Sequence, residues 1–81
     1  MQEIAMVTHY FSNIGVAVIK LSDTLKVGDT IQFKGTTTEF DQEIESMQVD
    51  HENITEAKKG DEVGLKVKEK VRVGDKVLKK E

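Results

Sequence analysis

The sequence contains no cysteine and no tryptophan, and only four of its 81 residues are Phe or Tyr. The absence of cysteine excludes disulfide bonds, thiolate chemistry and cysteine-ligated zinc sites. The fold must therefore be held together by its hydrophobic core. The scarcity of aromatic residues also leaves few side chains that could stack on a nucleic-acid base or anchor a partner.

Long apolar segments are also absent. No run approaches the ~20 apolar residues that a membrane-spanning helix requires. The opening MQEIAMVTHYF carries Glu3 and lacks the basic start and apolar run of a signal peptide. We expect a soluble, cytoplasmic protein that does not act at a membrane.

Motifs for catalysis and cofactor binding are missing as well. No serine lies in a nucleophile motif, and there is no P-loop. His9 and His51 lie far apart, and neither has a second His at metal-ligand spacing. We therefore expect no catalytic residues, no metal and no cofactor, so the protein is not expected to be an enzyme. The alternative, a small hydrolase acting through Glu45 or His51, would require an apolar pocket around one of them.

The residues that are present favour β-structure. Leu, Ile, Val and Phe make up 23 of the 81 residues, and 16 of these are Val or Ile. This content is enough for a packed core, and β-branched side chains suit a pleated sheet better than a helix. A chain of this length has room for one domain, which we expect to span residues 1–81.

Alternating apolar and polar residues predict about six short strands. Strands are expected over residues 3–11, 14–21 and 29–34, and over 36–49 with a bulge between Ile44 and Met47. The segment 14–21 is expected to be central, and either packed on both faces or bent at Gly15. Residues 50–61 are expected to form a loop that plugs one end of the fold with Ile54. Two last strands should direct Val63, Leu65, Val67, Val71 and Val73 inward. The pattern fits an all-β fold, either a small closed barrel or a sandwich, and we favour the barrel because closure leaves no strand edge unpaired.

The dipeptide Gly-Asp occurs three times, at Gly28-Asp29, Gly60-Asp61 and Gly74-Asp75, each time just before an alternating run. This position predicts a turn in which Gly adopts a positive or otherwise costly φ and Asp accepts hydrogen bonds from backbone amides. A phosphate-binding loop is the alternative, but it would need several glycines opening a helix.

Two segments could meet other molecules. Residues 41–57 hold six acids and no Lys or Arg, whereas residues 58–81 hold nine bases and five acids. A stripe that could contact RNA phosphates, or simply aid solubility, consists of Lys66, Lys68, Lys70, Arg72 and Lys76. The aromatic run His9, Tyr10 and Phe11 could bind a partner, or could cap the end of the barrel.

Three segments resemble a known family: GVAVIKLSDTLKVGDTIQFKG, ESMQVDHENITEAKKGDEVGLKV and VRVGDKVLK are similar to the second domain of translational GTPases such as elongation factor Tu. VTHYFSNIGVAV and GTTTEFDQEIESMQ resemble small stand-alone elongation factor-like proteins and the C-terminal barrel of collagenase-like peptidases. The resemblance implies a closed antiparallel barrel of six to seven strands without GTPase activity of its own. In the elongation factors this barrel helps to hold the 3′ end of tRNA. A family Glu that contacts the terminal adenosine aligns with Gln48.

These observations lead to two hypotheses. The first is a non-catalytic, translation-factor-like barrel that binds tRNA or rRNA through the lysine stripe and Gln48. The alternative is a protein-interaction module that acts in trans with a peptidase-like or GTPase partner and uses the surface around His9, Tyr10 and Phe11.

Overall fold

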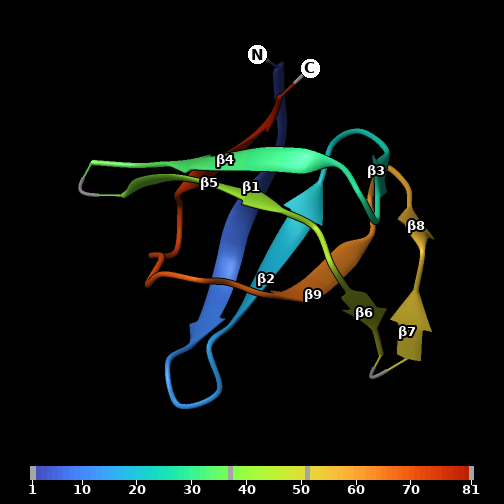
Figure 1. The fold of residues 1–81 in the computed structure, drawn as a ribbon, viewed down its shortest axis with the longest axis horizontal. Helices are drawn as coiled ribbons and strands as arrows, with labels where there is room; N and C mark the ends of the chain where they lie inside the picture. Colours follow the sequence, from blue (N-terminus) through green and yellow to red (C-terminus); the bar gives the residue numbers. More distant parts are fainter. Residues whose placement is uncertain (1, 37, 51, 81) are drawn as a thin grey trace.

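The computed structural model describes residues 2–36, 38–50 and 52–80, and these ranges contain strands and loops but no helix (Figure 1). The strands are β1 (Gln2–Phe11), β2 (Val16–Leu21), β3 (Leu25–Lys26), β4 (Thr30–Lys34), β5 (Glu39–Glu43), β6 (Met47–Val49), β7 (Glu52–Ile54), β8 (Glu56–Ala57), β9 (Glu62–Lys66) and β10 (Lys76–Lys80). The prediction of an all-β protein is confirmed for the described residues.

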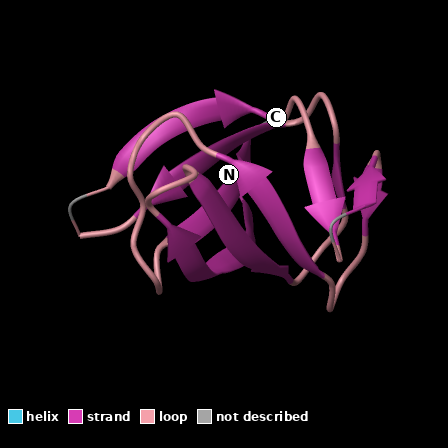
Figure 2. Cartoon of the chain, turned by 90° about the horizontal axis from the view of Figure 1, so that it is seen from below, coloured by secondary structure: helices cyan, strands magenta, loops and turns pink. Residues whose placement is uncertain are grey.

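Eight of these strands form one antiparallel sheet in the order β5-β4-β10-β1-β2-β9-β6-β7, and β3 pairs with β8 separately. The first and last strands are therefore neighbours, and the two ends of the chain lie close together (Figure 1). In the view of Figure 2, curved strands of this sheet surround the interior. The segment 14–21 was expected to be central, and β2 does lie in the middle of the sheet.

The prediction of a closed barrel with six to seven strands was wrong in its detail. Within the described residues, the ladder of paired strands ends at β5 on one side and at β7 on the other. One reason is that the predicted strand 36–49 is interrupted at residues 44–46, so β5 and β6 become separate strands. The other is that residues 52–54 and 56–57 form β7 and β8 in place of the predicted loop plug. Ile54 packs only half-buried against the core, and Ala57 is the buried residue of this segment.

The core follows the predicted alternation along most strands. Val63, Leu65 and Val67 are buried as expected, and the buried hydrophobic residues form one cluster. Phe33 and Phe40 are register partners on β4 and β5, and their ring centroids lie 5.0 Å apart. Val73 contradicts the prediction, since 67% of it is exposed. Residues 67–75 leave the sheet, so the two-residue period of a strand no longer decides which way Val73 points.

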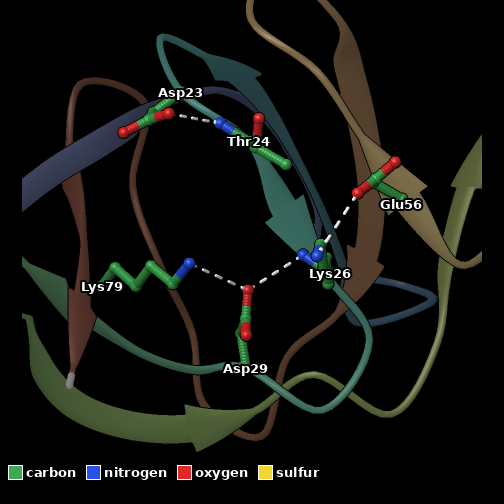
Figure 3. A network of polar contacts seen from close by, with 6 residues as sticks. All are labelled: Asp23, Thr24, Lys26, Asp29, Glu56 and Lys79. Carbon is green, nitrogen blue, oxygen red and sulfur yellow. Dashed lines mark hydrogen bonds and ion pairs between the residues drawn. The ribbon is translucent and has the colours of Figure 1, made fainter.

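The three Gly-Asp pairs form the same turn, as predicted. Gly28, Gly60 and Gly74 have φ between 93° and 98°. In each turn the backbone N–H of the Asp donates to the carbonyl three residues before it, at 3.0–3.1 Å. The Asp Oδ2 in turn accepts the N–H of that earlier residue, at 2.9–3.0 Å. Figure 3 shows the first copy, where Asp29 Oδ2 also lies 3.4 Å from Lys79 Nζ of β10.

Each turn also clamps a buried residue elsewhere in the chain. The Gly N–H donates to that residue's carbonyl, and that residue's N–H donates to the Asp carbonyl, at 2.8–2.9 Å. The clamped residues are Ile44, Leu21 and Val7, all of them in the core. The repeated dipeptide is therefore a corner that fixes two separate pieces of backbone to one another.

A side chain spans the gap that the backbone ladder leaves between β5 and the end of β9. The amide Nε2 of Gln42 donates to the carbonyl of Lys66 at 2.5 Å, and the N–H of Lys68 donates to Gln42 Oε1 at 2.9 Å. Gln42 is buried, so its amide replaces a pair of backbone hydrogen bonds between the two segments.

Candidate functional site

An apolar groove runs across the outer face of the middle of the sheet. It is lined by Phe11, Ile14, Val16, Val18, Gln48, Asp50, Glu62 and Gly64. We call this surface the apolar groove. The residues come from the end of β1, the β1–β2 turn, β2, β6 and its following turn, and β9.

The alternation of β2 explains the apolar floor of the groove. Ala17, Ile19 and Leu21 point into the core, so Val16 and Val18 point outward and remain half-buried. Of the two expectations for this segment, packing on both faces is therefore wrong, and Gly15 has a positive φ of 65° in the turn before β2. Gly64 lies opposite Val18 on β9, and its missing side chain deepens the groove. A Cβ added at Gly64 would meet Val16 Cγ1 at 3.7 Å, an ordinary contact distance.

Two large apolar side chains at this groove stay in contact with solvent. Phe11 is 47% exposed and Ile14 is 59% exposed. The rings of His9 and Phe11 stack with centroids 6.3 Å apart, so the two side chains share one face of β1. Tyr10 lies on the opposite face and packs half-buried against the core. The predicted partner-binding run is therefore divided by the pleat: His9 and Phe11 are accessible, and Tyr10 contributes to the fold.

The charge around the groove is negative. Asp50 and Glu62 are the charged residues that line it, and no Lys or Arg of the described residues does so. Gln48, the residue aligned with the family Glu, lies here and donates from Nε2 to Asn53 Oδ1 at 3.0 Å. Gln48 therefore shares the groove with two acids, while Lys66 of the stripe lies next to this groove on β9, opposite Val16. The sequence reasoning missed Ile14, Val16 and Val18, although their positions before and along β2 could have been read from the two-residue period.

The predicted lysine stripe is exposed, but the fold divides it. Lys66 and Lys68 line a hollow together with Gln42, Glu43, Glu45 and Ser46. Arg72 and Lys76 line another hollow, together with Lys34. Lys70 is exposed and lines neither. The stripe was predicted from two strands, whereas residues 67–75 form a loop with three of its five cations.

The groups considered for catalysis or metal binding are not assembled into a site in the described part of the chain. Glu45 is exposed in a hollow lined by other charged residues, and His51 lies outside the described residues. Across residues 2–36, 38–50 and 52–80, no group of three or more His, Asp or Glu is placed to hold a metal ion. The same ranges contain no helix long and apolar enough to cross a membrane.

Comparison with known proteins gives the chain a family context. No family model matches it. It is 43% identical over 76 residues to an uncharacterized protease of Methanocaldococcus jannaschii, which covers 93% of this chain and 19% of that protein. It is 38% identical over 72 residues to a collagenase of Porphyromonas gingivalis, covering 86% of this chain and 20% of that protein. The chain therefore spans about a fifth of the length of these relatives.

Among solved structures, the C-terminal domain of a Geobacillus thermoleovorans protein assigned to the U32 peptidases superposes with a TM-score of 0.93. The match covers 99% of this chain and 93% of that domain, with 22% identity. The chain has the fold of a U32 peptidase C-terminal domain. This fold and the sequence relatives support the peptidase-related part of the predicted resemblance, and they do not support an identity as a translation elongation factor. The extent of the domain and the cytoplasmic location stay predictions.

Proposed function

We propose that this chain is a non-catalytic protein-docking module that binds a peptidase-like partner through the apolar groove. The observation that carries the proposal is the exposure of Phe11 and Ile14 beside a groove floored by Val16, Val18 and Gly64. Exposed apolar patches bordered by polar residues often mark protein interaction sites. Burying the exposed parts of Phe11 and Ile14 would contribute about 1 kcal/mol each.

The comparisons supply the context for the partner. The relatives carry a segment similar to this chain within proteins about five times as long, and their names describe a protease and a collagenase. A module of this fold next to a peptidase-like domain is therefore the arrangement that we extend to this chain. The absence of an assembled acid, base and nucleophile in the described residues favours docking over catalysis.

The charge of the groove favours a protein over RNA as its occupant. Asp50 and Glu62 would repel phosphate groups, whereas they would attract Lys or Arg on the rim of a protein surface. The whole chain has a formal net charge of −3, which also disfavours nonspecific binding to nucleic acid.

The proposal is tested by capturing partners on the immobilised chain from nuclease-treated native lysate and measuring the purified partner by calorimetry. We expect to capture a peptidase-like protein. The Kd of its complex with the double variant Phe11→Ser and Ile14→Ser should be at least about tenfold higher, because two contacts of about 1 kcal/mol each together exceed the ~1.4 kcal/mol that corresponds to a factor of ten. Gly64→Val should also weaken binding, since it fills the groove floor.

Met6→Ser is the matched control, because Met6 lies on the same strand, is also 47% exposed and does not line the groove. Capture that is unchanged by the groove substitutions would contradict the proposal. Capture that disappears on nuclease treatment would instead favour the RNA hypothesis.

A further inference from the structure

A second surface lies outside the apolar groove, where the end of β4 meets the turn before β10. Its cations are Lys34 of β4, Arg72 of the third Gly-Asp turn and Lys76 of β10. Gly35, Thr36 and Glu3 line the same hollow. We call it the cationic hollow.

Two of these cations, Lys34 and Lys76, repel each other in the folded sheet. Lys34 and Lys76 are direct register partners in neighbouring antiparallel strands. Like charges directly opposite one another destabilise a sheet. Glu39 is the partner of Lys34 on the other side, yet no ion pair joins them within 4 Å. The sheet therefore tolerates a repulsion that a neutral residue at either position would remove.

Two other lysines of β10 form ion pairs with acidic side chains. Lys79 lies 3.4 Å from an Asp29 carboxylate oxygen, and Lys80 lies 2.6 Å from Asp41. In the hollow, Lys76 has Glu3 at 3.7 Å, with both side chains largely exposed. Lys34 and Arg72 have no acidic partner within the described residues. The hollow is lined by these three cations and by two acids, Glu3 and Asp75, so its net charge is +1.

Hydrogen bonds and close packing hold the turn beside the hollow in place. The N–H of Arg72 donates to Asp75 Oδ2 at 2.9 Å, and the turn is fixed to Val7 of β1 by two further backbone bonds. Asp75 is only 6% exposed and packs directly against Gly35, where an added Cβ would lie 2.0 Å from Asp75 Oδ1. The end of β4 therefore packs directly against the turn, which reduces the backbone ordering that binding would cost.

From this placement we infer that the cationic hollow binds a phosphoryl group. A phosphate monoester carries a charge of about −1.5 to −2 at neutral pH and three acceptor oxygens, so it can contact two lysines and one arginine at once. A carboxylate would be satisfied by the Arg72 guanidinium alone. The phosphoryl group could belong to a small phosphorylated molecule or to an RNA backbone, and the site is independent of the protein-docking groove.

The test is an amide chemical-shift titration of the isotope-labelled full chain by NMR. Inorganic pyrophosphate is the probe in one arm and a short single-stranded oligouridylate is the probe in the other, each at low and at physiological salt. We expect shifts centred on residues 34–36 and 72–76 in at least one arm. Lys34→Gln and Arg72→Gln should each raise the Kd at least about fivefold, because a charge-assisted contact is lost.

Two controls keep the result interpretable. Lys59→Gln removes a lysine that lies in another Gly-Asp turn and lines none of the three hollows, so it should leave both titrations unchanged. Lys34→Gln should leave the melting temperature equal or higher, since it removes a like-charge pair. The arm that shows the localised shifts identifies the source of the phosphoryl group. Absence of shifts in both arms at low salt, or equal weakening by Lys59→Gln, would overturn the inference.

Discussion

At the scale of single residues, the three Gly-Asp turns share the same hydrogen bonds but differ in the burial of the Asp side chain. All three carboxylates accept the N–H that lies three residues earlier. Asp29 and Asp61 keep partial contact with solvent, whereas Asp75 is buried against Gly35. Water can replace a lost acceptor at the first two turns, but it has little access to the third.

The first prediction compares two of these turns. Asp75→Ala should lower the free energy of unfolding by about 2 to 3 kcal/mol, because it removes the acceptor of the partly buried Arg72 N–H and leaves a cavity where the buried Asp75 side chain packed. Asp61→Ala should lower it by about 1 kcal/mol. Urea unfolding followed by circular dichroism measures both values. Asp75→Asn keeps an acceptor oxygen and should recover part of the loss, and equal costs for Asp75→Ala and Asp61→Ala would show that burial is not the cause.

The pleat also decides which aromatic residues can act at the surface. His9 and Phe11 alternate with Tyr10 along β1, so two of the three residues are accessible and one belongs to the core. A run of adjacent aromatic residues in the sequence cannot all face one partner when the run is a strand.

At the scale of elements, the least regular part of the fold is the gap between β5 and the end of β9. Among the described residues, the hydrogen bonds that link these segments come from the amide of Gln42. It provides one donor and one acceptor in the spacing that a neighbouring strand would otherwise provide. A side chain therefore completes the contact that the interrupted strand at residues 44–46 cannot make.

The second prediction tests this link. Gln42→Leu conserves volume but leaves the Lys66 carbonyl and the Lys68 N–H unpaired, so the free energy of unfolding should fall by about 1 to 3 kcal/mol. Hydrogen exchange at the Lys68 amide should become faster, whereas amides in the centre of β2 should be much less affected.

Gln42→Glu is the matched variant, because a carboxylate can still accept from Lys68 but cannot donate to Lys66. Protonation restores the donor, so the stability difference between this variant and the natural chain should narrow as pH falls. An unchanged Lys68 exchange rate in both variants would mean that the amide bridge contributes nothing to this seam.

The strands themselves were largely predictable, and the exceptions have physical causes. Alternation located β4 and β9 and their buried faces, because a residue that must face the core recurs every second position. The shift of the apolar phase between Ile44 and Met47 correctly indicated an irregularity, which is a break at residues 44–46, where the backbone groups of Ile44 bond to the first Gly-Asp turn. Alternation failed at Val73, where the chain has left the sheet. Local sequence carries no signal for a partner that lies far along the chain.

At the scale of the whole molecule, the two ends of the chain complete the same sheet. β10 lies between β4 and β1 and pairs with both, and Val77 is fully buried. β10 thus joins the β5-β4 part of the sheet to the part that begins with β1.

The third prediction follows from this topology. Removing residues 77–81 should abolish the cooperative thermal transition, because two strands lose their neighbour and the core loses Val77. Circular dichroism and the dispersion of amide resonances measure the loss. Lys80→Gln is the control, since it breaks only an exposed ion pair with Asp41 and should cost less than about 1 kcal/mol. Cooperative melting of the shortened chain would show that β10 is dispensable.

The candidate site was only partly accessible to sequence reasoning. Phe11, Arg72 and Lys76 are exposed, as their predicted binding roles require, but the residues that share a surface with them were not predicted. Lys34 joins Arg72 and Lys76 through strand pairing across more than 35 positions, and Gln48 joins Phe11 through the order of strands in the sheet. Such groupings depend on register and topology, which alternate patterns do not specify.

Taken by itself, the sequence determined that this protein is built from strands, which of their faces are buried and where its three corners lie. These properties depend on neighbouring residues: the two-residue period, β-branched side chains, and the freedom of glycine beside an aspartate. The tertiary structure alone decided that the ladder stays open and that Gln42 bridges β5 and the end of β9. It also decided that Asp50 and Glu62 line the apolar groove and that Lys34 lies opposite Lys76. Those features arise from contacts between residues that are distant in the chain, and only the folded arrangement brings them within range of one another.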